Sequence, residues 1–436
     1  MAKSPDIGKF SRYYAAVRFL EAVGKVNSGY QKTDLKSHPR PEIFLERMRD
    51  FLDLLGSPEK GFRYIHITGT SGKGSVAAAV HGELVRAGKK SGLFTSPFTV
   101  STIEKIQVGD RYIDPLVFRD ITETLKPAIE QMAKSGRNGT PSYFEMIFAI
   151  ALIYFQKMRC EYAVLEVGLG GRYDATNIII SPLITAVTNI GLDHTQILGS
   201  KRSDIAKDKA GIIKPGSRFF TTESDPKILK IFKGECEKTG AVFQPIRVAG
   251  LDYDSRNRSL AGHICANLGI IDTPKKIKKM PSLPARFEIV EEKPLIIIDG
   301  AHNPSKLEST IYNLKRFKFK KLTLIMAISA EKDWKNMVRM IAPLADRIYA
   351  CQFKVMGRKS VDAEVLAKTA RKHTGKPSDV YCRRDPVEAF TEARKNLSKG
   401  DALLVVGSFY LVGFIRALYC SEDRILRNRN SEIKIS

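Results

Sequence analysis

Hydrophobic and polar positions along the chain follow two alternating patterns. Short runs rich in β-branched and aliphatic residues are typical of buried strands, and the segments between them space their apolar residues as one face of a helix does. The strand-like runs are residues 64–68, 163–167, 183–188, 295–299, 322–326, 347–350 and 402–406. Such alternation predicts an α/β protein with a mostly parallel sheet of the phosphate-loop type, wrapped by helices.

One stretch interrupts the alternation. Residues 271–286, IDTPKKIKKMPSLPAR, are punctuated by prolines, rich in lysine and without periodicity, which predicts a linker between two packed units. A chain of 436 residues is long enough for about two or three domains. We predict a larger domain, residues 1–283, followed by a smaller α/β, Rossmann-like C-terminal domain, residues 284–436.

The composition, 43% hydrophobic and 27% charged, is that of a globular protein. The N-terminal sequence MAKSPDIGKF has no apolar segment followed by a small-residue cleavage site. The longest apolar run, residues 146–155, is about half as long as a membrane span. Six cysteines lie far apart without a C-x-x-C pair, which argues against a zinc site or a disulfide framework. We expect a cytoplasmic protein with reduced thiols and no membrane partner.

The net charge of +24 is compatible with two kinds of ligand, nucleic acid and small polyanionic substrates. The densest basic stretches are residues 274–281 and 314–322. Neither carries a nucleic-acid-binding motif, so a solvated face or linker is the favoured interpretation and no nucleic-acid partner is expected.

A glycine-rich loop follows the first strand-like run. Residues 66–76, HITGTSGKGSV, lead into a helical segment at 76–84, so the glycines occupy a strand-to-helix turn. The phosphate-loop pattern G-x-x-x-x-G-K-[ST] is not met, because Gly74 separates Lys73 from Ser75. The same physics applies, since backbone N–H groups and a helix N-terminus attract phosphate. Lys73 offers a cation to the terminal phosphates and Ser75 a hydroxyl to Mg²⁺; the alternative is a turn without a ligand.

Acidic and imidazole groups follow other strand-like runs. The residues at or just after the ends of such runs are Glu166, the pair Asp193 and His194, and Asp299 with His302. The carboxyl edge of a parallel sheet is where α/β proteins bind ligands. Each also has a plainer interpretation, because an aspartate at a strand end commonly caps a helix and a histidine commonly belongs to the core.

Taken together, these motifs resemble the folylpolyglutamate synthase and dihydrofolate synthase family of the Mur ligase superfamily, over residues 44–416. The segments that carry the resemblance are HITGTSGKGS, GLFTSPF, SYFE, LEVGLGGRYDATN, LDHTQILG, IAKDKAGIIK, LPARFE, IIDGAHNP, AEKDW and GSFYLVG.

The resemblance implies an ATP-dependent ligase. The γ-phosphate passes to a substrate carboxylate, and the amine of L-glutamate then displaces phosphate to leave an amide. The implied acceptor is a folate, with dihydropteroate as a second one, and the implied cofactor is one or two Mg²⁺ ions. Because the carboxylate is already anionic, the repulsion between oxygens must be neutralised by Lys73, Mg²⁺ and backbone donors.

The same resemblance assigns roles to residues. ATP is bound by Thr70, Ser71, Gly72, Lys73, Gly74, Ser75, Asn267, Arg286 and Asp299. The metal is held by Ser75, Ser96, Glu166 and His194. The catalytic residues are Lys73, Glu166, His194, Lys209 and His302. The folate or pterin is bound by Tyr143, Phe144, Glu145, Tyr173, Asp174 and Ala175.

Lys209 is the implied site of a modification, since the family carries a carbamylated lysine there. Carbon dioxide adds only to an uncharged amine, so we expect Lys209 to have a lowered pKa. Tyr143 and Phe144 are equally compatible with core packing.

Two positions depart from the family's pattern: Ser71 replaces an asparagine in the glycine loop, and in GHICAN Ile264 replaces a glutamine while Asn267 keeps its spacing. Two other functions are compatible with the sequence. One is a ligase of the same superfamily that acts on a different carboxylate, and the other is a basic nucleotide- and nucleic-acid-binding protein. For the folate ligase we expect small-molecule substrates and a monomer.

Overall fold

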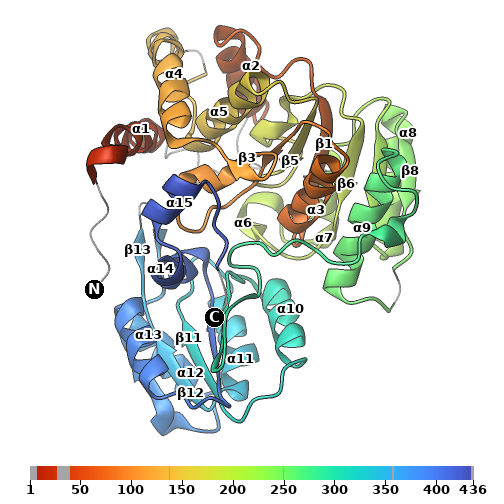
Figure 1. The fold of residues 1–436 in the computed structure, drawn as a ribbon. Helices are drawn as coiled ribbons and strands as arrows, with labels where there is room; N and C mark the ends of the chain where they lie inside the picture. Colours follow the sequence, from red (N-terminus) through yellow and green to blue (C-terminus); the bar gives the residue numbers. More distant parts are fainter. Residues whose placement is uncertain (1–6, 27–39, 137, 249, 356–357, 434–436) are drawn as a thin grey trace. The chain divides into compact units, whose positions relative to one another are not determined.

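The hydrophobic runs of the sequence form the central strands of two sheets in the computed structural model (Figure 1). The structure describes residues 7–26, 40–136, 138–248, 250–355 and 358–433. These divide into a larger unit, residues up to 97 and 102–281, and a smaller unit, residues 98–101 and those from 282 onward. The predicted division after residue 283 lies two residues beyond this one and does not set residues 98–101 apart.

Within the described residues, the larger unit is built on a sheet of eight strands in the order β4-β3-β2-β5-β1-β6-β7-β8. The six strands from β2 to β8 in that order are parallel, and β3 and β4 are antiparallel additions at one edge. The bounds are β1 Arg63–Thr68, β2 Ser91–Phe94, β3 Ile106–Val108, β4 Arg111–Tyr112, β5 Tyr162–Glu166, β6 Ile184–Val187, β7 Arg218–Thr221 and β8 Val242–Pro245.

Helices cover both faces of this sheet, because parallel strands are joined by right-handed crossovers. From β1 through α3 to β2 the chain moves along the sheet in one direction, and from β6 through β7 to β8 it moves in the other direction. The helix α3 therefore lies on one face of the sheet, with α9 beside it, and α7 and α8 lie on the other face. The helix bounds are α1 Ile7–Val26, α2 Ile43–Leu54, α3 Lys73–Arg86, η2 Thr102–Lys105, α4 Pro115–Ser135, α5 Tyr143–Lys157, η3 Ala175–Ile178, α6 Thr195–Leu198, α7 Arg202–Ala210, α8 Pro226–Thr239, α9 Tyr253–Asn267 and η4 Pro274–Lys276.

The smaller unit has, within the described residues, a six-stranded sheet in the order β15-β12-β11-β16-β10-β9, in which β9 alone is antiparallel. Its strands are β9 Glu288–Glu292, β10 Leu295–Asp299, β11 Leu322–Met326, β12 Arg347–Ala350, β15 Val380–Cys382 and β16 Ala402–Val406, with a separate hairpin of β13 Lys354–Val355 and β14 Arg358–Lys359. Its helices are α10 Pro304–Leu314, α11 Trp334–Ile341, η5 Ala342–Leu344, α12 Ala363–Arg371, η6 Pro377–Asp379, α13 Pro386–Lys395, α14 Phe409–Tyr419 and α15 Glu422–Asn428.

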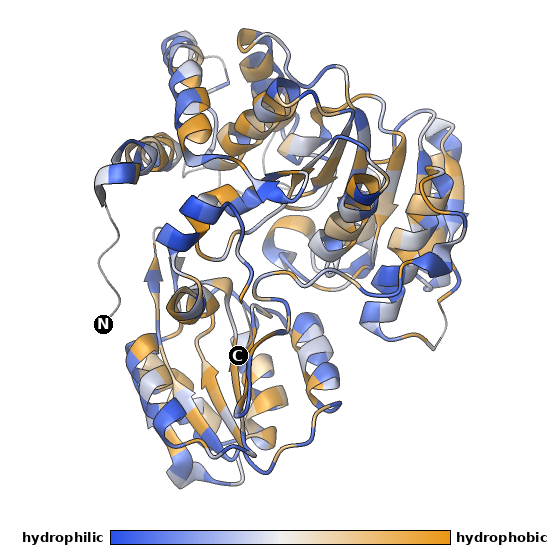
Figure 2. Cartoon of the chain, viewed as in Figure 1, coloured by the Kyte–Doolittle hydropathy of each residue, from blue (hydrophilic) through white to orange (hydrophobic). Residues whose placement is uncertain are grey.

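Alternating side chains of the strands build a core on each face of this second sheet. In β10, Ile297 packs into a cluster with α10, α11 and α12, whereas Ile296 and Ile298 pack into a cluster with α13 and α14. Because both faces are covered, the central strands β11 and β16 are buried along their whole length and are mostly apolar, as their colour in Figure 2 shows. The fold class is the predicted one, with the smaller α/β domain at the C-terminal end.

All seven predicted strands are confirmed, and four of them have the predicted bounds. The strands β2, β7 and β8, of four residues each, are not among the predicted runs. The predicted linker contains the single turn η4, and it is packed rather than free. A Cβ on Gly262 of α9 would lie 2.2 Å from the carbonyl oxygen of Pro274.

In the part of the chain that the structure describes, no helix combines the length and apolarity needed to cross a membrane. All six cysteines are free thiols, as predicted, and five of them are buried, with Cys382 partly exposed.

A buried ion pair joins β9 to α14 in the smaller unit. The Arg416 Nε and Nη2 atoms donate to the two carboxylate oxygens of Glu288, at 2.8 and 2.9 Å, and the side chains are only 1% and 9% exposed. The same carboxylate accepts the backbone N–H of Ala285 at 2.8 Å. The pair therefore fixes the end of the linker to the C-terminal sheet.

We expect Arg416→Ala to lower the free energy of unfolding of this unit by about 3–5 kcal/mol, because it leaves the Glu288 carboxylate buried without its counter-ion. The single tryptophan, Trp334, lies in the same unit, so urea unfolding followed by its fluorescence reports the loss. Arg394→Ala is the control, since Arg394 is 53% exposed and pairs with Glu291 of the same strand; we expect it to cost less than about 1 kcal/mol. Equal, small losses in the two variants would contradict this assignment.

Candidate active site

The glycine loop lies between β1 and α3, where the sequence predicts it. Gly72 adopts a left-handed conformation with φ of 82° and directly precedes α3, and Gly69 has φ of 147°. A Cβ on Gly69 would lie 1.8 Å from the Thr188 hydroxyl oxygen. Only glycine fits there, because the loop passes against the chain that follows β6.

That neighbouring chain holds the loop through hydrogen bonds. The Thr70 N–H donates to the Asn189 carbonyl at 3.0 Å, and the Ser71 N–H donates to Asn189 Oδ1 at 2.9 Å. The Thr188 hydroxyl donates to the Ser71 carbonyl at 2.6 Å. The Thr70 hydroxyl donates to the Gly191 carbonyl at 3.1 Å and accepts the Gly191 N–H at 2.9 Å.

The first amides of the loop are therefore used within the protein. The donors suited to an anion are those of the first turn of α3, whose N–H groups have no acceptor within the helix. They belong to Gly72, Lys73, Gly74 and Ser75, which are among the predicted ATP-binding residues. The Ser71 hydroxyl is also buried without a hydrogen-bond partner among the described residues, as expected of a group that meets a ligand.

Two lysines approach each other beside this loop. Lys73 Nζ donates to the Gly69 carbonyl at 3.1 Å, and Lys209, at the end of α7, donates to the Gly170 carbonyl at 3.4 Å. The Lys209 side chain is only 4% exposed. Burial, followed by the positive charge of Lys73, lowers the pKa of Lys209 to about 7. A substantial fraction of this amine is uncharged near neutral pH, which is the condition that the predicted carbamylation requires.

A buried carboxylate lies under the first turn of α3. Glu166, the last residue of β5, accepts the Ser96 N–H at 2.9 Å. One of its oxygens lies 3.0 Å from where a Cβ of residue 74 would be. The structure thus brings together three of the four predicted metal ligands, Ser75 in this turn, Ser96 and Glu166.

The fourth predicted metal ligand, His194, follows the loop that contacts the glycine loop. It has a left-handed backbone with φ of 51° and precedes α6, and its Nε2 atom lies 3.9 Å from the Asp193 carboxylate. Among the residues that the structure describes, no three His, Cys, Asp or Glu side chains gather closely enough to hold a metal. A Mg²⁺ ion fits these residues only with further oxygens from nucleotide and water, which is how proteins usually bind it.

The two segments predicted to bind folate meet each other. The ring of Phe144 lies against Gly168, where a Cβ would be 2.6 Å from the ring, and the same Cβ would be 3.2 Å from Asp174 Oδ2. Tyr143 is partly buried; its hydroxyl lies 3.2 Å from the Thr102 hydroxyl, and burial raises its pKa to about 12.

Glu145 and Asp174, predicted to contact the substrate, have hydrogen-bond partners inside the protein. Glu145 forms a bidentate ion pair with Arg47, at 2.8 and 2.9 Å, and also caps the start of α5. Asp174 accepts the N–H groups of Leu169 and Thr176. Both carboxylates hold the surrounding segments in place; for Glu145 the sequence could not show this, because Arg47 lies 98 residues away in the chain.

The remaining residues of this segment differ in exposure. Ala175 is buried at the start of η3. Tyr173 is only partly buried, and its hydroxyl donates to Glu42 at 3.5 Å. Burial raises the pKa of Tyr173. Tyr173 is thus more accessible to a substrate than its two successors.

An amide that is not among the predicted ATP-binding residues, Asn257, faces the glycine loop, whereas the predicted ATP-binding residue Asn267 lies elsewhere on the same helix. Both lie on α9, and a Cβ on Gly72 would be 2.4 Å from Asn257 Oδ1. Ten residues of helix place Asn267 about 15 Å further along the axis. In the sequence, the start of α9 is indicated by Asp252, which caps the helix by accepting the Ser255 N–H at 2.7 Å.

In the smaller unit, a strained turn presents Arg286. The residues on either side, Ala285 and Phe287, both have positive φ, 57° and 46°, which costs energy for residues other than glycine. The Arg286 guanidinium lies 4.7 Å from the ring centre of Phe409. The Asp299 carboxylate accepts the Phe287 N–H at 3.2 Å and so holds the turn.

The Asp299 carboxylate accepts several hydrogen bonds. It also accepts the Ala301 N–H at 2.8 Å and the Thr310 hydroxyl at 3.0 Å, and burial raises its pKa to about 6. His302 has both ring nitrogens engaged, Nδ1 with the Gly300 carbonyl at 2.8 Å and Nε2 with Lys306 Nζ at 3.1 Å.

Comparisons with known proteins agree with this architecture. Residues 67–246 match the Mur ligase middle domain, and residues 285–409 match the Mur ligase glutamate ligase domain. The two matches together span more than half of the chain.

Similar proteins match over most of their length. The dihydrofolate synthase/folylpolyglutamate synthase of Bacillus subtilis is 29% identical over 416 residues, covering 85% of this chain and 94% of that protein. The folylpolyglutamate synthase of Lacticaseibacillus casei is 29% identical over 408 residues, covering 85% and 93%. The crystal structure of folylpolyglutamate synthase from Thermotoga maritima is 27% identical, with a TM-score of 0.74 over 96% of this chain and 98% of that one.

We expect stability to depend on pH through Lys209. Its pKa is about 7 in the folded protein against 10.5 as the ordinary value, so between these values the unfolded chain binds a proton that the folded protein does not. The free energy of unfolding therefore rises with pH in this window, by at most about 1.4 kcal/mol per pH unit from this group. Lys209→Met should remove that contribution, and urea unfolding at several pH values from about 7 to 9, in buffer free of CO₂ and divalent metal, measures it.

Lys105 is the internal control for this measurement. It is also buried, with its pKa lowered to about 7, and it remains in both proteins. Curves of stability against pH that run parallel for wild type and Lys209→Met would contradict the assignment.

Proposed function

Because the chain belongs to the Mur ligase family, we propose that it is an ATP-dependent ligase that joins L-glutamate to a folate. Two curated relatives that match over 85% of this chain bear the name folylpolyglutamate synthase, and the Bacillus subtilis one is also named a dihydrofolate synthase. We therefore propose dihydropteroate as a second acceptor. These comparisons favour a folate acceptor over a different carboxylate or a nucleic acid.

The observation that carries the proposal is the convergence of charge at the glycine loop. Lys73, Lys209 and Glu166 come from three different elements and lie at the start of α3. Transfer of a phosphoryl group to a carboxylate brings anionic oxygens together, so cationic and N–H groups must already be in place. The first turn of α3 supplies the N–H groups, and Lys73 supplies the cation.

We propose Mg²⁺ as the metal, held by Ser75, Ser96, Glu166 and His194. Support comes from a homologous fold solved with Mn, AMPPNP and L-glutamate bound, and from the Escherichia coli protein solved with ADP. The ion, when bound, would neutralise charge on the phosphates. The chain's own part is to keep the Glu166 carboxylate buried and aligned by the Ser96 N–H.

We propose that Lys209 is carbamylated in the active enzyme. Its burial favours the neutral amine, and a carbamate would replace a cation with an anion next to Lys73. The like-charge repulsion between the two lysines would then become an attraction, which helps to hold Lys73 in place.

For the acceptor we propose contacts with Tyr143, Phe144 and Tyr173, which are partly exposed. Glu145 and Asp174 support these residues from within the protein. For the nucleotide we propose Asn257 in addition to Asn267, because the Asn257 amide lies at the glycine loop. In the smaller unit Arg286 offers a guanidinium to phosphate, and Asp299 holds its turn. The cytoplasmic location and the monomer stay predictions.

We expect purified protein, given ATP, Mg²⁺ and L-glutamate, to add one glutamyl unit to tetrahydrofolate or dihydropteroate and to release ADP. Lys73→Ala should lower kcat/KM by about 10²–10³-fold, the usual effect of removing one charge-stabilising donor. Product mass and ADP release are measured together.

The matched control is Lys89→Ala, since Lys89 is an exposed lysine just after the far end of α3, and its activity should equal that of the wild type. The proposal fails if neither acceptor gains a glutamyl unit and no ADP appears, or if Lys73→Ala keeps full activity.

A further inference from the structure

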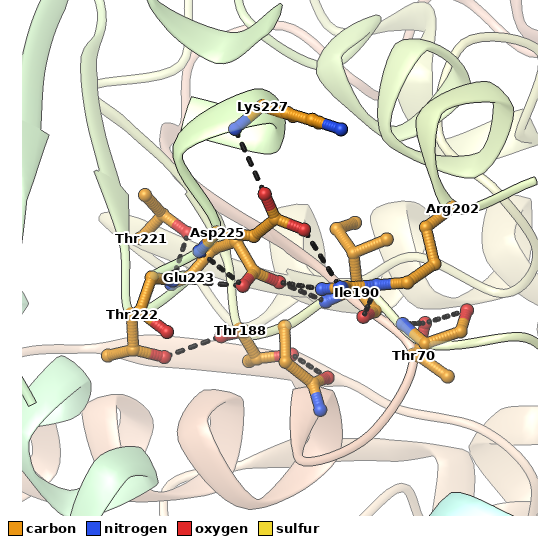
Figure 3. Close-up of polar contacts among 12 residues, drawn as sticks. Thr70, Thr188, Ile190, Arg202, Thr221, Thr222, Glu223, Asp225 and Lys227 are labelled. Carbon is orange, nitrogen blue, oxygen red and sulfur yellow. Dashed lines mark hydrogen bonds and ion pairs between the residues drawn. The ribbon is translucent and has the colours of Figure 1, made fainter. Parts of the chain in front are cut away.

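A pair of charged residues holds the backbone of Ile190 beside the glycine loop (Figure 3). The Ile190 N–H donates to Glu223 Oε2 at 3.0 Å, and the Ile190 carbonyl accepts from Arg202 Nε at 3.0 Å. Arg202 Nη2 donates to the same Glu223 oxygen at 3.2 Å. The two peptide groups that flank the Ile190 Cα are thus bound by side chains of opposite charge.

Ile190 lies in the chain between Asn189 and Gly191, the two residues that hold the glycine loop. Asn189 accepts the N–H groups of Thr70 and Ser71, and Gly191 exchanges two hydrogen bonds with the Thr70 hydroxyl. A shift of the Ile190 peptide therefore moves both neighbours and, through them, the start of the loop.

The pair is built to be rigid. The second oxygen of Glu223 accepts the N–H groups of Ser224 and Asp225 at 2.9 and 3.1 Å, so the carboxylate, whose side chain is 8% exposed, has four donors. Arg202 Nη1 donates to the Asp225 carboxylate at 2.9 Å. A guanidinium with three fixed acceptors is a planar fork that allows little rotation.

The same ion pair involves segments that carry other residues of the proposed site. Arg202 is the first residue of α7, and Lys209 lies near the end of that helix. The chain that contains Ile190 continues to Asp193 and His194. One ion pair thus connects the glycine loop, the helix of Lys209 and the segment of His194.

We propose that Glu223 and Arg202 are positioning residues for nucleotide binding, which they serve by fixing the Ile190 peptide and through it the glycine loop. This inference rests on the proposed function, because it requires that the loop bind a nucleotide phosphate. It differs from a purely structural role, in which the pair would stabilise the end of β7 and the start of α8 without affecting the loop.

The test compares Arg202→Ala, Arg202→Lys and Glu223→Gln with the wild type, using ADP and Mg²⁺ as the ligand in calorimetry. We expect Arg202→Ala to weaken ADP binding about tenfold, a loss of about 1.4 kcal/mol, while the KM for L-glutamate stays unchanged. Arg202→Lys should lose less, because the ammonium can replace part of the fork. Added guanidinium ion should partly restore ADP binding to Arg202→Ala, since this side chain is 42% exposed.

Hydrogen exchange supplies a readout that needs no ligand. Amides in peptides covering residues 66–76 and 184–195 should exchange faster in Arg202→Ala, because Thr70, Ser71 and Ile190 are donors in this network. Arg63→Ala is the control: it removes an ion pair with Glu161 at 3.2 Å from the opposite end of β1, and it should change neither exchange at the loop nor ADP binding.

Each outcome decides between the hypotheses. If Arg202→Ala binds ADP as tightly as the wild type and its amides exchange at the wild-type rate, the positioning role is overturned and the proposed function stays intact. A wild type that binds no ADP would refute the proposed function itself and the positioning role with it. A loss of ADP binding that matches the loss in Arg63→Ala would assign the effect to general stability. If Glu223→Gln does not fold, Arg202→Ala decides, because its side chain is at the surface.

Discussion

The site depends on one close approach between two backbone segments. The glycine loop passes so near the end of β6 that the Thr188 hydroxyl occupies the place of a side chain at position 69. This proximity lets Asn189 and Gly191 accept and donate the hydrogen bonds that hold Thr70 and Ser71. The N–H groups of the first turn of α3 are then left to face a ligand.

Around this contact the protein concentrates charge in a buried place. Lys73 and Lys209 repel each other, and the buried one has its pKa lowered to about 7 as a result of burial and of its neighbour. Glu166 adds a negative charge under the same helix turn. Such an arrangement is costly in an empty site, and it becomes favourable when phosphate and a divalent cation complete the charge balance.

Several acidic residues hold segments of the chain together within their own unit. Glu223 fixes the Ile190 peptide, Glu145 pairs with Arg47, and Glu288 pairs with Arg416 in the smaller unit. Each has its partner in a segment distant in sequence, and the oxygens of each carboxylate accept hydrogen bonds within the protein. Asp299 belongs with them, since its oxygens are taken by its own turn and by α10.

The sequence by itself determined the strands, the glycine loop and the family, because these depend on periods and motifs that are local in the chain. It placed Lys73 and Ser75 in a strand-to-helix turn and Glu166 at a strand end, and the family resemblance added Lys209; the structure brings these residues near one another. Only the tertiary structure decided which polar groups pair with distant segments, as Glu145 does with Arg47, and that Asn257 faces the glycine loop. It alone revealed the role of Glu223 and Arg202. The physical reason is that a hydrogen bond is defined by a partner's position in space, and no pattern along one segment encodes where a residue of another segment will lie.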